Sequence, residues 1–347
     1  MVDIKKVMVR KILFFLMCAM TVDMVWAETL ADQMRRQAVE FVGALPSDLQ
    51  KMQEQAVRQA MAGDLSALEA VRNSRNGRPE LPAGVTATDI GDRYRLYKPM
   101  AGDGKPLPVL IYLHGGGWCF GSMNSCARFC GEFAGEAGAA VLAVEYPLAP
   151  EHPYPAALDC CTDAVGFVRD HATEYGLDPD RVSIGGDSAG GNLALATALR
   201  LIYASGEDGG TVHPLHSLIL FYPVVKAWND GSGSWRDFGA GFGLDSGIME
   251  AFNEAYVGTE DPRSALISPF CAEKKHLSQL PPVLIVNADH DILRDQGAEM
   301  HAALVKAGVN ATRTVFPGTT HLFITVPGQT AAFREAVKMS AEFIRAL

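Results

Sequence analysis

The spacing of apolar positions along this chain changes near residue 85. Between residues 28 and 75, apolar side chains such as Met34 and Ala38 recur every three to four positions, which is typical of amphipathic helices. The Pro-Ser-Asp run at residues 46–48 interrupts the pattern, and we expect it to end one helix and cap the next. A polar linker containing Gly and Pro then runs from Asn73 to Gly84.

After this linker, short apolar runs alternate with stretches of helical spacing. The run Val109–Leu113 is apolar throughout, as expected for a strand of a parallel sheet that is buried on both faces. The predicted strands are Asp92–Tyr97, Val109–Leu113, Ala139–Val144, Arg181–Ile184, Leu218–Tyr222, Val283–Val286 and Thr312–Phe316. The predicted helices are Cys126–Glu136, Ala156–His171, Ala189–Leu201, Arg294–Ala307 and Ala331–Ile344. Such alternation predicts an α/β fold with one mostly parallel, doubly wound sheet, whose catalytic groups lie at the carboxyl ends of the strands.

One segment, residues 225–275, breaks the alternation. It is rich in Gly, Ser, Asp and aromatic residues, and about 50 residues is long for a connection without structure of its own. We expect it to be an insertion that packs over the carboxyl edge of the sheet together with the N-terminal helices.

Composition and charge restrict the class of function. Hydrophobic residues make up 48% and charged residues 20% of the 347 residues, which suits a globular chain with a large core. The formal net charge is −10. An acidic surface repels nucleic acids and anionic membranes, so neither is an expected partner.

The first 27 residues have the pattern of a secretory signal peptide. A basic stretch, Lys5 to Lys11, precedes the apolar run Ile12 to Met20, and Val25-Trp26-Ala27 offers small residues for cleavage. Two alternatives to a signal peptide are a membrane anchor and a buried N-terminal helix. The apolar run is short for a membrane anchor. We therefore expect export to the periplasm or the medium, with no stable membrane association after cleavage.

Six cysteines follow this segment: Cys119, Cys126, Cys130, Cys160, Cys161 and Cys271. They form no CxxC pair, so their spacing does not predict a zinc site. Some of them could form disulfides in an exported protein, but the sequence does not assign the pairs.

The first chemical motif is Gly186-Asp187-Ser188-Ala189-Gly190, which matches GxSxG. A predicted strand precedes it and an Ala/Leu-rich helix follows it. A nucleophilic serine on such a tight strand-to-helix turn needs small neighbours because its backbone is strained and crowded. The context therefore indicates that Ser188 is a nucleophile.

The second motif, His114-Gly115-Gly116-Gly117-Trp118, directly follows the strand that ends at Leu113. Glycines without Cβ atoms let backbone N–H groups approach a substrate closely. Because an oxyanion hole needs such preorganised donors, the expected donors are the amides of Gly116, Gly117 and Ala189. The alternative is an ordinary glycine turn.

A base and an acid should follow in the chain order Ser, Asp, His. His321 lies after the last predicted strand and is the expected base. Three carboxylates follow the preceding strand, namely Asp289, Asp291 and Asp295; we assign the triad acid to Asp291 and expect Asp295 to begin a helix.

Together these motifs resemble those of the bacterial hormone-sensitive-lipase-like carboxylesterases, members of the α/β-hydrolase superfamily. HGGGW and GDSAGG are similar to the two signature motifs of that family, the stretch Tyr146–Ala157 to a third, and Asp291–Asp295 to its acid loop. The resemblance extends from about residue 90 to 325. It implies an α/β-hydrolase fold with a helical cap, formed here by residues 28–84 and an insertion around 225–275 of a catalytic domain at 85–347. Leu322 departs from the family, which more often has Gly there.

The predicted function is a serine carboxylesterase that hydrolyses short-chain esters of small molecules through an acyl-enzyme, without metal or cofactor, as a monomer or homodimer. An amidase, a formamidase or a longer-chain lipase would use the same triad. A non-catalytic small-molecule receptor is a further alternative, although such proteins lose the Ser or the His. The aromatic residues Trp118, Trp228, Trp235 and Phe238 are candidates for the pocket wall or for the core of the cap. Asp187 and Glu151 are expected to support the site or to anchor loops.

Overall fold

The computed structural model describes residues 28–100, 104–206 and 215–347. Eight strands in these ranges form one sheet in the order β1-β2-β4-β3-β5-β6-β7-β8. The strands are β1 (Val85–Ile90), β2 (Tyr94–Pro99), β3 (Leu107–Leu113), β4 (Ala140–Val144), β5 (Leu177–Asp187), β6 (Leu218–Phe221), β7 (Val283–His290) and β8 (Ala311–Thr320). β1 and β2 pair antiparallel, β2 pairs antiparallel with β4, and all later neighbours pair parallel, so the prediction of a mostly parallel sheet is confirmed.

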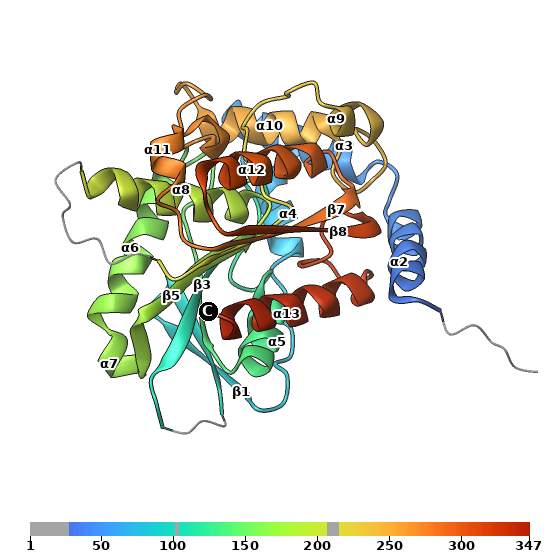
Figure 1. Cartoon of the computed structure of the whole chain (residues 1–347). Helices are drawn as coiled ribbons and strands as arrows, with labels where there is room; N and C mark the ends of the chain where they lie inside the picture. Colours follow the sequence, from blue (N-terminus) through green and yellow to red (C-terminus); the bar gives the residue numbers. More distant parts are fainter. Residues whose placement is uncertain (1–27, 101–103, 207–214) are drawn as a thin grey trace, which may run out of the picture.

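Helices cover both faces of this sheet and bury two apolar layers (Figure 1). The helices α5 (Ala127–Ala137) and α13 (Thr330–Arg345) cover one face. The helices α6 (Ala156–Asp170), α8 (Ala189–Ala204) and α12 (Arg294–Ala307) cover the other, and α7 (Ala172–Tyr175) leads into β5. The central strands are buried on both faces, which explains why their sequences are apolar runs rather than alternations.

The N-terminal residues are helical, as the spacing predicted, and the second of their three helices packs on the insertion. These are α2 (Leu30–Ala44), α3 (Leu49–Met61) and α4 (Ser66–Ser74). α3 lies beside α10 (Ser246–Val257) of the insertion, where Arg58 bridges to Glu254 at 2.8 Å (Figure 1). The remaining short elements of this region are α9 (Gly233–Asp237), the 3₁₀ turn η1 (Pro269–Cys271) and α11 (Lys274–Leu277). Two segments far apart in sequence thus meet above the carboxyl ends of the strands.

Two local expectations were wrong. Asp48 precedes α3 but its side chain makes no capping hydrogen bond, because its backbone has already turned into a helical conformation. The N-terminal helical region also breaks a second time, between Met61 and Ser66, where Asp64 accepts from the amide and the hydroxyl of Ser66.

The six described cysteines all carry free thiols, and five of them are buried. Cys126 and Cys130 lie one helical turn apart with 3.7 Å between their sulfurs. Across the described ranges, none of the helices has the length and apolar character needed to span a bilayer.

Candidate active site

Ser188 lies at a sharp turn between β5 and α8. Its backbone has φ 54° and ψ −116°, a conformation that non-glycine residues rarely adopt, and its amide donates to the Phe221 carbonyl at 2.9 Å. A Cβ on Gly186 or Gly190 would collide with the Leu113 carbonyl of the neighbouring strand. The two glycines of GxSxG are therefore required by close packing, and the strained turn presents the serine side chain at the carboxyl edge of the sheet.

His321 and Asp291 meet across the neighbouring ends of β8 and β7. The Nδ1 atom of His321 lies 2.7 Å from Oδ2 of Asp291, and both side chains are almost fully buried. The second carboxylate oxygen of Asp291 accepts the Leu293 amide at 2.9 Å, which fixes the plane of the carboxylate. An imidazole held in this way keeps a proton on Nδ1 and leaves Nε2 as the acceptor.

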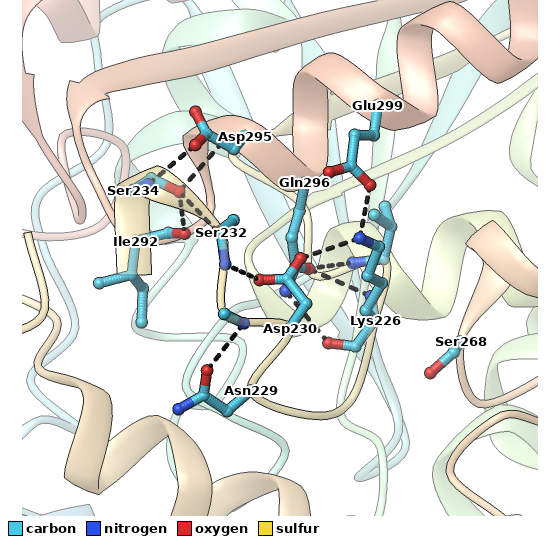
Figure 2. A network of polar contacts seen from close by, with 12 residues as sticks. Lys226, Asn229, Asp230, Ser232, Ser234, Ser268, Ile292, Asp295, Gln296 and Glu299 are labelled. Carbon is cyan, nitrogen blue, oxygen red and sulfur yellow. Dashed lines mark hydrogen bonds and ion pairs between the residues drawn. The ribbon is translucent and has the colours of Figure 1, made fainter. Parts of the chain in front are cut away.

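The two other carboxylates of the acid loop have different partners. Asp289 accepts the Gly318 amide at 3.0 Å. Asp295 accepts the Ser234 amide at 2.8 Å (Figure 2). It also binds the Arg294 guanidinium at 3.0 Å. As expected, Asp295 lies in the first turn of a helix, α12, and there it ties α9 of the insertion to the acid loop.

The glycine loop after β3 leaves its amides available. Gly116 and Gly117 have φ of 119° and 60°, values that side chains with a Cβ disfavour, and a Cβ on Gly117 would collide with the ring of Phe252. Within the described ranges, the amides of Gly116 and Gly117 donate to no acceptor of the protein. The amide of Ala189 is the first of α8 and has no acceptor within its own helix. The expected donors are thus free to bind an anion.

Asp187 binds the start of the glycine loop. Its carboxylate accepts from the Tyr112 hydroxyl at 2.9 Å and from the Gly115 amide at 3.0 Å. Burial raises the pKa of Asp187 to about 6, although the Tyr112 hydrogen bond opposes the shift. Burial also lowers the pKa of the neighbouring His114 to about 4, so this imidazole stays neutral near pH 7.

Glu151 lies in the loop after β4 and binds the N-terminal helix α4. It forms a two-pronged ion pair with Arg72, at 2.6 and 2.9 Å. The same guanidinium donates to the carbonyls of Cys119 and Ala149, so α4 is tied to the segment after the glycine loop.

A cavity of about 30 Å³ brings the predicted site residues together. Ser188, His321, Gly116 and Gly117 all line it. Its apolar wall consists of Phe120, Leu244, Ile248, Phe252 and Leu322. Of the two alternatives for Trp118, Trp228, Trp235 and Phe238, the pocket wall is wrong, because none of them lines this cavity.

Those four aromatic side chains have other partners. Trp118 is fully buried and stacks on Tyr256 of α10 at 4.3 Å. Trp228 stacks under Arg263, and Phe238 packs on Phe242. Trp235 is buried in the core.

Two residues that position the histidine were missed by the sequence reasoning. The amide nitrogen of Gln329 donates to the carbonyls of Thr320 and His321 at 3.2 Å each, and Tyr222 packs its ring against the His321 imidazole at 4.3 Å. Tyr222 directly follows β6 in the chain, and its backbone has a positive φ of 36°. No motif surrounds either residue, so their roles follow from the fold alone. Among the described residues there is also no cluster of His, Cys, Asp and Glu suited to a metal ion.

Comparison with known proteins agrees with this geometry. A family model described as alpha/beta hydrolase fold matches residues 110–325. Carboxylesterase NlhH from Mycobacterium tuberculosis is 36% identical over 220 residues, covering 63% of this chain and 67% of the relative. Esterase LipI from the same species is 33% identical over 266 residues, covering 76% of this chain and 79% of the relative.

Solved esterase structures are similar over most of the chain. An ester hydrolase from the metagenome of Lake Arreo, solved with a bipyridine phosphonate derivative, superposes with a TM-score of 0.69 at 30% identity and covers 86% of this chain and 99% of the other. A thermostable esterase from Pseudomonas putida superposes with a TM-score of 0.73 at 26% identity, covering 89% and 94%.

Proposed function

The chain belongs to the hormone-sensitive-lipase-like carboxylesterases of the α/β-hydrolase fold and is a carboxylic ester hydrolase, and from this premise we propose that Ser188, His321 and Asp291 are its catalytic triad. The observation that carries the proposal is the 2.7 Å contact between His321 Nδ1 and Asp291, beside a strained Ser188 that lines the same cavity.

In the proposed reaction, Nε2 of His321 takes the proton of the Ser188 hydroxyl as its oxygen attacks the ester carbonyl. Asp291 holds the imidazole in the required tautomer and stabilises its cation. The amides of Gly116, Gly117 and Ala189 donate to the oxyanion of the tetrahedral intermediate. His321 then protonates the departing alcohol, and water attacks the acyl-enzyme by the reverse sequence to release the acid.

Replacement of the nucleophile tests the assignment. Ser188→Ala is expected to lose at least about a thousandfold in kcat on p-nitrophenyl acetate, because the acyl-enzyme no longer forms. A fluorophosphonate probe should label the wild type at Ser188 and leave the variant unlabelled. Ser183→Ala, a buried serine of β5 outside the cavity, is the matched control. Normal turnover by Ser188→Ala would contradict the assignment.

We also propose a preference for short acyl chains on soluble esters, with the helices of residues 28–84 and the segment around 225–275 acting as a cap. The support is the small cavity at Ser188, whose wall includes Phe252 and Ile248 of α10 and Gln53 of α3. A series of p-nitrophenyl esters from acetate to palmitate, with amide analogues, measures the limit. A maximum of kcat/KM at ten carbons or more would contradict it.

Export is a separate proposal, since the predicted signal peptide, residues 1–27, lies outside the described residues. The support is the charge and hydropathy pattern of the segment. N-terminal sequencing of the protein from a cell fraction would find Glu28 first if cleavage follows Ala27. Light scattering on the mature chain would decide between monomer and homodimer.

A further inference from the structure

A second, larger cavity opens beside the catalytic one. It has a volume of about 460 Å³ and shares Gln50, Arg75, Gly116 and Leu322 with the cavity at Ser188. A substrate whose carbonyl lies at Ser188 can therefore extend past Gly116 and Leu322 into this space. The apolar part of its lining comes from Leu45, Leu49, Pro79, Val326 and Pro327.

The charge of these two cavities is opposite to that of the protein. The chain has a formal net charge of −10, yet no aspartate or glutamate lines either cavity, whereas two arginines, Arg75 and Arg128, line the larger one. Arg75 lines both cavities, so it belongs to the boundary that the cavity at Ser188 shares with the larger one.

Arg75 has no carboxylate partner within the described residues, unlike its neighbours in sequence. Arg72 binds Glu151, and Arg78 lies 3.6 Å from Asp89. The Arg75 guanidinium lies 5.4 Å from the centre of the Phe120 ring, and burial alone lowers the pKa of this group. A half-buried guanidinium without a counter-charge is costly to hold unless a ligand supplies that charge.

Arg128 is the second positive group of the larger cavity. It lies in the first turn of α5 and stacks on Phe333 of α13, with 3.7 Å from its guanidinium carbon to the ring centre. No carboxylate of the described residues lies within ion-pair distance of it. The two guanidiniums are thus held by aromatic rings rather than by acids, which leaves their N–H groups available.

We propose that the enzyme prefers esters that carry a carboxylate on the part of the substrate that occupies the larger cavity, such as half-esters of short dicarboxylic acids. Arg75 is the main specificity residue because it lines both cavities, and Arg128 contributes as the second cation of the larger cavity. A planar carboxylate accepts two parallel N–H bonds from a guanidinium, which a neutral substrate of the same shape does not. This inference rests on the proposed esterase function and names its substrate class.

The test compares isosteric substrate pairs. Monoethyl glutarate is paired with its amide, ethyl 5-amino-5-oxopentanoate, and 4-acetoxybutanoate with 4-acetoxybutanamide, so that the charge lies on the acyl or on the alcohol side. The expected result is a kcat/KM ratio of about tenfold or more for the carboxylate in at least one pair, as for charge-assisted hydrogen bonds. Ethyl 4-sulfobutanoate tests whether any anion suffices, and a preference for this sulfonate would overturn the assignment to a carboxylate.

Three variants make the test specific to the residues. Arg75→Gln should reduce the carboxylate-to-amide ratio at least about fivefold, Arg75→Lys should reduce it less, and Arg75→Gln with Arg128→Gln should bring it close to one. Arg78→Gln, an exposed neighbour outside both cavities, should keep the ratio of the wild type. Because the ratio is internal to each variant, loss of folded protein does not change it.

The possible outcomes distinguish failure of the proposed carboxylate preference from failure of the proposed esterase function. Equal rates on carboxylate and amide in both pairs, or an unchanged ratio in Arg75→Gln, would overturn the substrate class while p-nitrophenyl acetate is still hydrolysed. Absence of Ser188-dependent hydrolysis of p-nitrophenyl acetate would overturn the proposed function itself.

Discussion

The two sides of the candidate active site, the side of the acid loop and the side of the larger cavity, differ in whether their charged groups form ion pairs. On the acid-loop side, Lys226 binds Asp230 and Glu299 (Figure 2). Asp295 binds the Arg294 guanidinium, so each of these charges has a partner. On the side of the larger cavity, Arg75 and Arg128 lie over aromatic rings and form no ion pair with a carboxylate of the described residues. Paired charges hold the shape of a site, whereas an unpaired charge beside a cavity is available to a ligand.

The difference has an energetic meaning. The Lys226 side chain is 9% and the Asp230 side chain 4% exposed, so breaking that pair would leave a buried charge alone. Arg75 and Arg128 are partly buried without an ion pair among the described residues, and burial lowers the pKa of both groups. Stability and substrate recognition are therefore expected to depend on different sides of the site.

The largest expected effect is on catalysis, at the acid that serves the histidine. Asp291→Asn should lower kcat by about a thousandfold or more, because the amide no longer holds the required tautomer of His321. Asp289→Asn and Asp295→Asn should each lose less than about tenfold, since neither contacts His321. Rates on p-nitrophenyl acetate measure this, and a larger loss at Asp289 would reassign the acid.

The next effect is on stability, on the paired side. Lys226→Met should lower the free energy of unfolding by about 3 kcal/mol, because Asp230 keeps its charge in a buried place without a cation. Urea unfolding followed by circular dichroism is the measurement, with the exposed Lys275→Met as control. A loss below about 1 kcal/mol would show that the pair does not hold this side together.

Asp187, which belongs to neither side, accepts its hydrogen bonds from the neutral donors of Tyr112 and Gly115 rather than from a cation. Its pKa of about 6 exceeds the ordinary 3.8, so between these values the folded state holds a proton that the unfolded chain releases. This carboxyl therefore lowers stability as pH rises from about 4 to 6, by up to about 3 kcal/mol. His114, whose pKa is lowered to about 4 from 6.5, acts in the opposite sense, since stability falls as pH drops through that range.

In the wild type these two slopes offset each other. Asp187→Asn should leave the His114 slope alone, so that stability rises more steeply with pH between 4 and 6 in the variant than in the wild type. Urea unfolding at pH 4, 5, 6 and 7 gives both slopes. Parallel curves for the variant and the wild type would contradict the raised pKa of Asp187.

The smallest effect is expected on the unpaired side. Arg128→Met, the same replacement as at Lys226, should change the free energy of unfolding by less than about 1 kcal/mol, because methionine still packs on Phe333 and no partner is left unpaired. If Arg128→Met costs as much as Lys226→Met, the contrast between the two sides fails. The same urea experiment decides it.

Most of the sheet could be predicted because its central strands are apolar runs between helices of clear spacing. β1 was not predicted: in this edge strand only Val85 is buried, so its pattern is too weak to separate from a loop. The break between α3 and α4 was missed although Gly63, with a φ of 101°, and Asp64, which accepts from the Ser66 amide, mark it, because the apolar spacing continues across it.

The grouping of the candidate site residues was predictable where they follow one another in chain order, and not where it depends on packing. Ser188, Asp291 and His321 each follow a strand of the parallel sheet, and parallel strands end at one edge. Gln329 and Phe252 come from a helix boundary and from the insertion, and nothing in the spacing of either segment indicates that it faces the histidine or the glycine loop.

The free thiols have a practical consequence for labelling chemistry. Cys119, Cys126, Cys130, Cys160 and Cys161 are buried, whereas Cys271 is partly accessible. Burial raises the pKa of Cys271, so a maleimide dye would attach slowly, and mildly alkaline buffer would favour it. Cys271 follows Phe270, whose amide donates to the Val225 carbonyl in the segment after β6. For the described part of the native protein, one attachment point thus exists without mutagenesis, and a fluorophore there would report on the loop that carries Lys226.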